Sequence, residues 1–309
     1  MIVLLLLEVF VRIAIPGIKP QGTSEDIIAS NIYYGSRGLR PNSIGFSNGA
    51  RVIVDEFGFR KSSEINLSKP SWLYLGDSVT MGLGIESDST FAGIVQKNVT
   101  STNILNPSVI GNDIQDYLRF VKYFIAERKA KFNIKNLTIF WCLNDIYYNV
   151  ADVQTPGGGI RHLFGNFLNF LRLHSRSYYL AKTIIFDRAK AYFLYDQQFY
   201  RANDPNFVKA YQIISQINEI CKNNQVLFNI YLIPYEFQMR NKTEPLREPQ
   251  KLMLKTLESM CILAFDAMPY MLSKSDKSKD LFLIGDGIHL SNKGHHILAD
   301  FILENTTRN

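Results

Sequence analysis

Strongly apolar runs alternate with amphipathic stretches from Trp72 onward, and this alternation limits the fold more than any other feature. The apolar runs are SWLYLGD, NILNPS, LTIFWCLND, VLFNIYLIP and CILAFDAM. The stretches with helical character are TFAGIVQKNV, DIQDYLRFVKYFIAERKA, NFVKAYQIISQINEICKNN, EPQKLMLKTLESM and SNKGHHILADFILEN. Runs that are apolar at their centres are typical of strands buried on both faces of a parallel sheet. The pattern predicts an α/β fold, a doubly wound and mostly parallel five-stranded sheet with helices on both faces.

Two segments precede this domain, which we place at residues 70–309. Residues 1–16 are almost entirely apolar and contain Glu8 and Arg12, spaced to pair on one helix face. A spanning helix needs about 20 apolar residues. We expect a membrane anchor here, and the alternative is an apolar helix docked on the domain. Residues 17–69 are rich in Gly, Ser and Asn, so we expect an irregular extension with one short strand at RVIVDE.

Residues 151–205 break the alternation of strands and helices. The segment is rich in aromatic and basic residues and is too long for a simple crossover. It predicts a helical insertion. The insertion could be a lid or a wall of an acyl pocket, or a helical hairpin packed on the sheet edge.

Composition excludes several classes of protein. Hydrophobic residues make up 46% of the chain and charged residues 20%, as in globular proteins. The net charge of +6 is dispersed, without the basic run of a nucleic-acid-binding arm, so we expect no nucleic-acid partner. Cys142, Cys221 and Cys261 form no metal-binding or disulfide pattern, and we expect three buried side chains. No dinucleotide or P-loop motif is present, and the sequence predicts neither a cofactor nor a metal.

Ser78 follows the first apolar run directly, where a parallel sheet presents its functional side chains. Serine is a nucleophile only when a base accepts its proton. The segment LIGDGIHLSNKGHH places Asp286 three residues before His289, just ahead of a predicted helix with Ser291 as its N-cap. This spacing lets the carboxylate reach Nδ1 of the ring and leaves Nε2 free for a serine.

The other histidines have no such partner. His295 and His296 are adjacent within a predicted helix, and we expect both at the surface. His162 and His174 lie in the insertion without an acidic neighbour. Ser47 lies in a literal G-x-S-x-G motif, GFSNG, without the strand and helix of a nucleophile elbow, so we interpret it as a turn residue.

A serine nucleophile also needs donors for the negative charge that develops on the carbonyl oxygen, and one donor contributes about 3 kcal/mol. The backbone N–H of Ser78 is one candidate. Gly111 follows the second apolar run and Asn144 follows the third. A glycine permits close backbone approach, and an amide donates without adding charge. Asp77, by contrast, is predicted to shape the turn through its backbone bonds.

These four blocks resemble the SGNH (GDSL-type) hydrolase superfamily, over about residues 70 to 303. The matching positions are Ser78 in LGDS, Gly111 in VIGND, Asn144 in CLND and His289 in DGIHLS. The resemblance implies a flavodoxin-like fold, a triad of Ser78, His289 and Asp286, and an oxyanion hole from Ser78, Gly111 and Asn144. The third block usually begins with glycine, where Cys142 stands. The segment NSIGF…DEFGFR is also similar to the extension of membrane-anchored members.

We therefore expect a serine esterase that cleaves or transfers acyl groups of an O-acylated glycan or a lipid ester. The membrane anchor would place the catalytic domain outside the cytoplasm, and a soluble cytoplasmic protein is the alternative. Two other functions stay open. One is a membrane-tethered glycan-binding protein without activity, and the other is a metal-dependent hydrolase using Asp77, Asp286 and His289.

Overall fold

The central sheet of the protein is five-stranded and entirely parallel. The computed structural model describes residues 2–19, 21–147, 165, 167 and 170–306. The sheet has the order β6-β5-β7-β8-β9. Its strands are β5 (Ser71–Leu75), β6 (Asn103–Leu105), β7 (Ile134–Trp141), β8 (Leu227–Leu232) and β9 (Leu263–Asp266). If the five strands are numbered by their order in the chain, their order across the sheet is 2-1-3-4-5. This is the flavodoxin-like arrangement, in which the winding reverses between β5 and β7.

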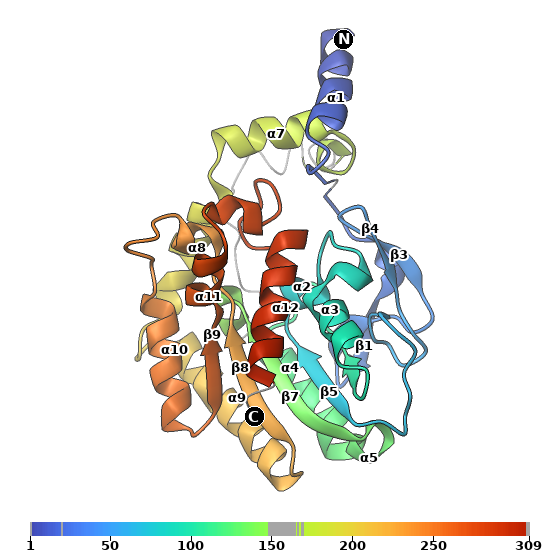
Figure 1. Ribbon diagram of the computed structural model, residues 1–309, viewed down its shortest axis with the longest axis vertical. Coiled ribbons are helices and arrows are strands. Elements are labelled where there is room, and N and C mark those ends of the chain that lie inside the picture. The colour runs from blue at the N-terminus through green and yellow to red at the C-terminus, as the bar shows by residue number, and fades with distance from the viewer. Residues whose placement is uncertain (1, 20, 148–164, 166, 168–169, 307–309) are drawn as a thin grey trace.

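Helices cover both faces of the sheet, as the alternation predicts (Figure 1). One face carries α3 (Phe91–Asn98), α11 (Ala267–Lys274) and α12 (Asn292–Thr306), which pack against one another. The other carries α4 (Ile114–Val121) and α9 (Pro205–Asn223), and α10 (Glu248–Ser259) packs beside β9. A π-helix, Lys122–Glu127, and α5 (Lys129–Phe132) continue α4. Helix α11 was not predicted, because the whole run CILAFDAM was interpreted as one strand. The strand ends at Asp266, whose carboxylate caps the helix that begins at Ala267.

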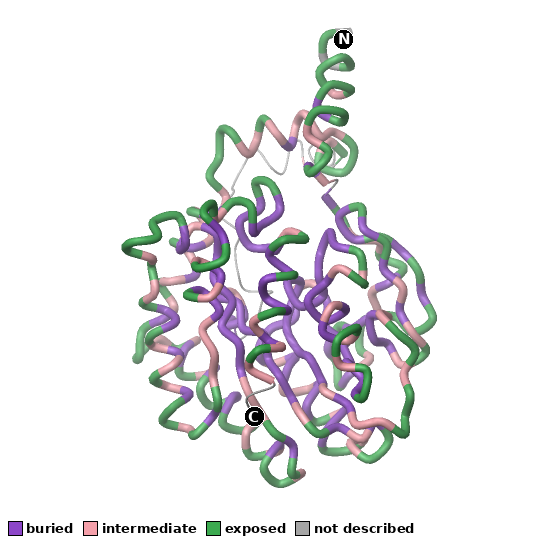
Figure 2. Tube along the Cα trace, in the orientation of Figure 1, coloured by how far each residue is buried: buried purple, intermediate pink, exposed green. Residues whose placement is uncertain are grey.

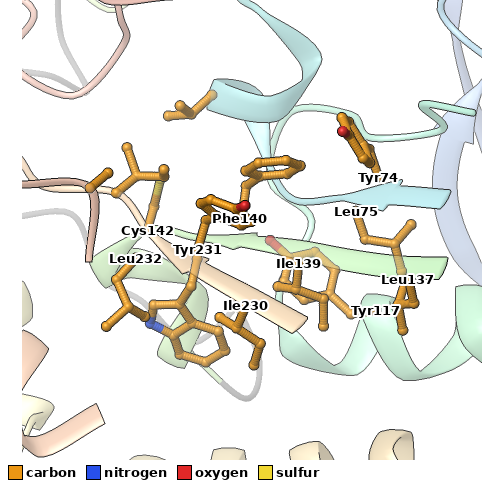
Figure 3. Packing of buried hydrophobic residues seen from close by; sticks show 14 of the residues in the cluster. Tyr74, Leu75, Tyr117, Leu137, Ile139, Phe140, Cys142, Ile230, Tyr231 and Leu232 are labelled. Carbon is orange, nitrogen blue, oxygen red and sulfur yellow. The ribbon is translucent and has the colours of Figure 1, made fainter. Parts of the chain in front are cut away.

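The core lies on both sides of the middle strands. Figure 3 shows side chains of β5, β7 and β8 packed in this interior. The Phe140 ring lies 4.4 Å from that of Phe91 on α3 and 4.9 Å from that of Tyr74 on β5. Tyr117 on α4 is fully buried as well. These strands are therefore enclosed, and their ends form the rigid edge from which the site is built.

The N-terminal extension is more regular than the sequence suggested. Where one strand was expected, two antiparallel hairpins occur, with strands β1 (Ile28–Tyr33), β2 (Ser36–Leu39), β3 (Ile44–Ser47) and β4 (Ala50–Ile53). The turn between β3 and β4 is Asn48–Gly49, with both residues at positive φ as a two-residue hairpin requires. The extension packs on the main domain through a small apolar cluster. Its buried members are Ile27, Leu39, Val52, Val54, Met81 and Val109.

The apolar N-terminus forms helix α1 (Ile2–Ala14), which projects from one end of the molecule beside α7 (Arg176–Ile185) (Figure 1). Glu8 and Arg12 pair as predicted, with Arg12 Nε 2.8 Å from Glu8 Oε1. The Glu8 carboxylate also accepts bonds from the N–H groups of Arg176 and Ser177, so it caps α7. Most of the helix surface is exposed (Figure 2). Across the described residues, every helix is too short or too polar to span a bilayer.

The described part of the insertion consists of α7, α8 (Arg188–Asp196) and a helical segment at residues 170–174. Residues 151–164, 166, 168 and 169 of the predicted insertion lie outside the described residues. Helix α8 packs against the 3₁₀ turns Leu143–Ile146 and Glu236–Met239, which follow β7 and β8. The insertion therefore lies over the carboxyl edge of the sheet.

Candidate active site

The candidate site lies at the carboxyl ends of β5 and β7, the two strands between which the winding reverses. Ser78 is the first residue of a short helix, α2 (Ser78–Met81), and is separated from β5 by Gly76 and Asp77. A Cβ atom on Gly76 would lie 1.9 Å from Thr80 Oγ1 and 3.1 Å from the Phe140 carbonyl oxygen. Glycine is needed here because the chain passes close to β7 as it turns into the helix.

Asp77 is the N-cap of α2. The sequence predicted that it shapes the turn through bonds to backbone N–H groups, and this is confirmed. Its Oδ1 accepts the Val79 N–H at 2.8 Å. Its Oδ2 lies 2.9 Å from Asn144 Nδ2 and 3.2 Å from Ser78 Oγ. Asp77 therefore holds the turn and also fixes one N–H of the Asn144 amide.

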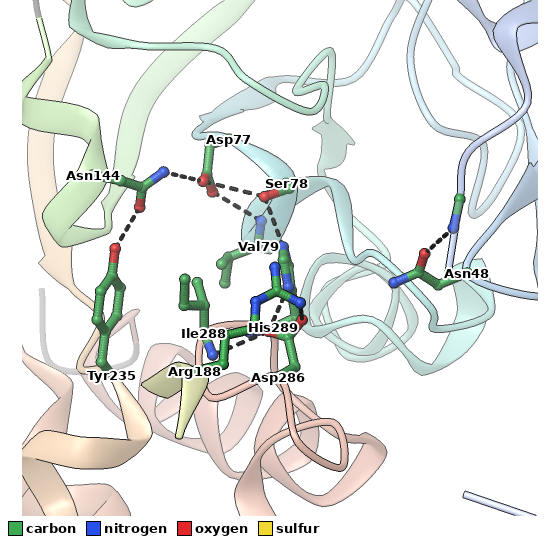
Figure 4. A network of polar contacts seen from close by, with 11 residues as sticks. Asn48, Asp77, Ser78, Val79, Asn144, Arg188, Tyr235, Asp286, Ile288 and His289 are labelled. Atoms are coloured by element: carbon green, nitrogen blue, oxygen red, sulfur yellow. Dashed lines mark hydrogen bonds and ion pairs between the residues drawn. The ribbon is translucent and has the colours of Figure 1, made fainter. Parts of the chain in front are cut away.

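Ser78, His289 and Asp286 are brought together in one relay (Figure 4). Ser78 Oγ lies 2.8 Å from His289 Nε2, and His289 Nδ1 lies 2.7 Å from Asp286 Oδ1. Ser78 and His289 are both buried, at 8% and 9% exposure. The hydroxyl has one proton, and the contact to His289 is shorter than that to Asp77. This geometry suits proton transfer from the serine to the ring.

The carboxylate of Asp286 is buried but well supplied with donors. Its Oδ1 also accepts the N–H groups of Ile288 at 3.1 Å and His289 at 2.8 Å, and its Oδ2 accepts Arg188 Nη1 at 3.1 Å. Burial alone would raise the pKa of Asp286, but the charges of His289 and Arg188 and the bonds from His289 hold it well below its usual range. Asp286 is therefore ionised when it orients the ring.

Asn144 and Gly111 reach the same edge of the sheet from the loops after β7 and β6. The Asn144 amide has a partner at each end, since Nδ2 donates to Asp77 and Oδ1 lies 2.9 Å from the Tyr235 hydroxyl. Gly111 has a φ of +76°, and its carbonyl accepts Arg37 Nη2 at 3.1 Å. The N–H of Ser78 lies in the first turn of α2, where no helical carbonyl is available to accept it.

Cys142 stands two residues before Asn144, where the resemblance noted in the sequence leads one to expect glycine. It is buried, and its N–H donates to Asp145 Oδ2 at 2.8 Å. This bond closes the 3₁₀ turn Leu143–Ile146 that carries Asn144. The small thiol is therefore accommodated in an ordered turn.

Three residues near the site were missed by sequence reasoning, namely Arg188, Asp196 and Tyr235. Arg188 pairs with Asp286, and the Tyr235 hydroxyl lies 2.6 Å from Asp196 Oδ2 as well as 2.9 Å from Asn144. These contacts join positions that are 39 to 98 residues apart in the chain. The sequence carries no local signal for such contacts beyond the unusual composition of the insertion.

The expectation that His295 lies at the surface was wrong. The ring is 1% exposed, stacks on Phe91, and accepts the Phe91 N–H on Nδ1 at 3.1 Å. Burial, with the positive charge of Arg60 nearby, lowers its pKa to about 3. His296 is exposed as predicted.

The remaining candidates lie away from the relay. His174 lies near α1, where its carbonyl accepts a bond from Arg12, and His162 is outside the described residues. Ser47 ends β3 and its hydroxyl pairs with that of Thr23. Cys142 and Cys221 are buried, but Cys261 is exposed, contrary to expectation, in a turn at positive φ.

A metal-binding arrangement was an alternative on the sequence. Within the described ranges, no group of three His, Cys, Asp or Glu side chains is placed to hold a metal ion. Asp286 and His289 instead bond to each other.

Comparison with known proteins finds likeness in structure alone. No family model and no curated protein matches the sequence. A member of the lipolytic protein G-D-S-L family from Veillonella parvula DSM 2008 shows 13% identity and a TM-score of 0.47, over 78% of this chain and 100% of that chain. TesA shows 13% identity and a TM-score of 0.46, over 76% of this chain and 96% of that chain. Axe2, an acetylxylan esterase from Geobacillus stearothermophilus, shows 13% identity and a TM-score of 0.46, over 78% of this chain and 95% of that chain. Likeness at this level carries no functional conclusion.

Proposed function

We propose that the protein is a serine esterase with Ser78 as nucleophile, His289 as base and Asp286 as the acid that orients the base. The observation that carries this proposal is the pair of short contacts from Ser78 Oγ to His289 and from His289 to Asp286, at 2.8 Å and 2.7 Å. In such a relay the carboxylate fixes the tautomer with the proton on Nδ1, and Nε2 accepts the serine proton.

In the proposed reaction, Ser78 Oγ bonds to the acyl carbon while His289 Nε2 takes its proton. The carbonyl oxygen becomes an oxyanion that accepts the N–H groups of Ser78 and Gly111 and the second N–H of the Asn144 amide, since the first is bound to Asp77. His289 then protonates the leaving alcohol as its bond to carbon breaks. Water, or a sugar hydroxyl in a transferase reaction, releases the acyl group by the reverse steps.

The proposed substrate is an O-acylated glycan or a lipid ester. The names of the structural neighbours include an acetylxylan esterase and a lipolytic protein, which represent these two classes. Hydrolysis and transfer use the same first half-reaction, so the site accommodates either one.

A panel of p-nitrophenyl esters of graded acyl length, measured on wild type, Ser78→Ala and Ser47→Ala, tests the proposal. We expect Ser78→Ala to lose at least about 10⁴-fold in kcat. Ser47→Ala removes a buried serine of the rival motif and should retain wild-type turnover. Preference for acetyl esters would favour the glycan, and preference for long chains the lipid. Wild-type turnover in Ser78→Ala would refute the proposal. A wild-type protein that cleaves no ester would instead favour the glycan-binding alternative.

We also propose that residues 1–16 attach the protein to a lipid surface. Exposed apolar side chains cover most of the α1 surface away from the Glu8–Arg12 pair, including Val3, Leu6, Phe10 and Ile13 at 61% to 76% exposure. An exposed apolar face of this width suits lipid better than a single protein groove. The base of α1 is fixed by Glu8. Burial alone would raise the pKa of Glu8, but the hydrogen bonds from Ser177, Arg176 and Ser175 lower it to about 2. The location of the domain outside the cytoplasm stays a prediction.

Sedimentation with phosphatidylcholine–phosphatidylglycerol vesicles tests this attachment. Leu6→Gln with Phe10→Gln should abolish binding and leave the hydrolysis of soluble esters unchanged. The matched control is Ile44→Gln with Phe46→Gln, which alters two exposed apolar residues of β3, each more than half exposed. Equal loss of binding in both double variants, or no binding by wild type, would refute the attachment.

A further inference from the structure

Helix α8 carries a charged side chain at each end, and both are directed at the candidate site. Arg188 is its first residue and Asp196 its last. The side chain of Arg188 is 23% exposed and Asp196 is 1% exposed. Eight residues of helix rise about 12 Å. Buried charges are costly unless they are paired, so their partners show what the helix is built to hold.

At the N-terminal end of α8, Arg188 binds the carboxylate of Asp286, which belongs to a different loop 98 residues further along the chain. The loop N–H groups of Ile288 and His289 and the His289 ring all face Oδ1 of Asp286. Oδ2 faces Arg188 Nη1, at 3.1 Å (Figure 4). The bond from Arg188 therefore fixes the rotation of the Asp286 carboxylate about its Cβ–Cγ bond. That rotation sets the position of Oδ1 relative to the His289 ring.

At the other end, Asp196 reaches Asn144 through Tyr235. The Tyr235 hydroxyl lies between the two, 2.6 Å from Asp196 Oδ2 and 2.9 Å from Asn144 Oδ1. Its single proton serves only one of these oxygens at a time, so the hydroxyl donates to Asn144 when Asp196 carries a proton and donates to Tyr235 in turn. Burial raises the pKa of Asp196 to about 6 and so favours that protonated form. Tyr147 donates to the other oxygen of Asp196. Because the hydroxyl faces Oδ1 of the amide, Nδ2 faces Asp77, the residue that precedes the nucleophile. The amide is thereby held with its donor end toward the turn that carries Ser78.

We propose that α8 is a positioning element of the catalytic site: Arg188 orients Asp286, and Asp196, through Tyr235, orients the amide of Asn144. The inference rests on the proposed esterase function. The insertion then has a fixed, structural role in catalysis, and is neither a mobile lid nor a hairpin without a role. Arg188, Asp196 and Tyr235 are positioning residues, since they contact residues of the site and not the reacting atoms.

The first half is tested with Arg188→Ala, measured by kcat, KM and melting temperature. We expect kcat to fall about 10- to 100-fold, as for a misplacement of about 1 Å, with KM little changed. Guanidinium ion added at millimolar concentration should restore part of the loss, because the side chain is partly exposed. Arg188→Lys should retain more activity than Arg188→Ala, and it serves if the alanine variant does not fold.

Arg247→Ala is the matched control for this half. Arg247 pairs with the buried Asp266 at 2.7 Å, with 34% of its own side chain exposed, and Asp266 caps α11 rather than orienting His289. This variant should keep wild-type kcat and show no response to guanidinium. Wild-type kcat in Arg188→Ala, or equal rescue of both variants, would overturn the role of Arg188.

The second half is tested with Tyr235→Phe in two backgrounds. In wild type it should lower kcat about 10-fold, less than the 10²- to 10³-fold typical for loss of an oxyanion donor, which we expect for Asn144→Ala. In the Asn144→Ala background it should have no further effect, because the group that it positions is gone. Tyr200→Phe removes a buried hydroxyl that bonds to Trp141 and Leu143, and should act equally in both backgrounds. Equal losses for Tyr235→Phe in both backgrounds would overturn its role.

Failure of the inference differs from failure of the esterase proposal. If wild type hydrolyses esters and Ser78→Ala does not, but these variants behave as their controls, the positioning role alone is wrong. If wild type shows no Ser78-dependent turnover, the esterase function is wrong and the positioning role falls with it.

Discussion

Replacing Asp286 with asparagine tests whether the relay requires a carboxylate. Four donors face its two oxygens, namely the His289 ring, the N–H groups of His289 and Ile288, and Arg188. Asparagine has one oxygen and one donor group. If its oxygen faces the loop, its amide N–H₂ faces Arg188. If it is turned over, the N–H₂ faces the two backbone N–H groups.

Either orientation of Asp286→Asn sets donors against donors in a buried place, which costs about 1–3 kcal/mol for each group left unsatisfied. When the N–H₂ faces the loop, the ring also loses the acceptor that fixes its tautomer, and a comparable change in a serine-protease triad lowers kcat about 10⁴-fold. We therefore expect a loss of several kcal/mol in the free energy of unfolding by urea and a loss of about 10⁴-fold in kcat on the preferred ester.

A second substitution separates the two effects. Arg188→Gln added to Asp286→Asn removes the opposed charge and should recover part of the unfolding free energy without recovering kcat. If Asp286→Asn keeps kcat within about 10-fold of wild type, the carboxylate does not orient His289 as we argue.

Three further predictions concern the frame of the site. Arg60 donates to three backbone carbonyls in the segment after Ser78. Arg60→Ala should therefore lower the free energy of unfolding by urea by about 3 kcal/mol or more. An unchanged free energy of unfolding would refute this role. Gly76→Ala should lower both stability and kcat, whereas wild-type values for both would show that the turn tolerates a Cβ. His295 has a folded pKa of about 3 against 6.5 unfolded, so the unfolded state binds its proton first as pH falls. Stability should decrease from about pH 6.5 toward 3, by up to about 1.4 kcal/mol per pH unit, and His295→Asn should reduce that slope. An unchanged slope would contradict this assignment.

The sheet was predictable because its strands are buried on both faces. Each of the five apolar runs overlaps a strand of the parallel sheet, although β7 begins three residues before its run, at Ile134. The spacing of Asp286 and His289 likewise predicted their contact, since both lie in one short loop. Apolar runs and short spacings depend only on residues that are close together in the chain, so they can be recognised in a single sequence.

The N-terminal hairpins were missed although one signal was present. Asn48–Gly49 is a strong hairpin turn, but only the second strand was predicted, at RVIVDE, because β3 is four residues long and exposes its apolar residues Ile44 and Phe46. Burial of His295 was missed for another reason. Its place against Phe91 depends on the packing of α12 on α3, two helices about 200 residues apart.

Contacts of the insertion could not be predicted at all. Arg188 and Asp196 look like ordinary polar residues of a basic, aromatic helix, and their partners lie 98 and 39 residues away. The resemblance that identifies Asn144 says nothing of the hydroxyl that turns its amide. Only the fold brings these side chains together.

The most direct measurement is the site of covalent labelling by a fluorophosphonate, located by mass spectrometry of the digested protein. Phosphonylation requires a serine whose proton is taken by a base, and the 2.8 Å contact to His289 marks Ser78 as that serine. We expect one adduct, on the peptide that contains Ser78, with labelling lost in Ser78→Ala, retained in Ser47→Ala and unaffected by a chelator. An adduct on another residue, or labelling that persists in Ser78→Ala, would contradict this expectation.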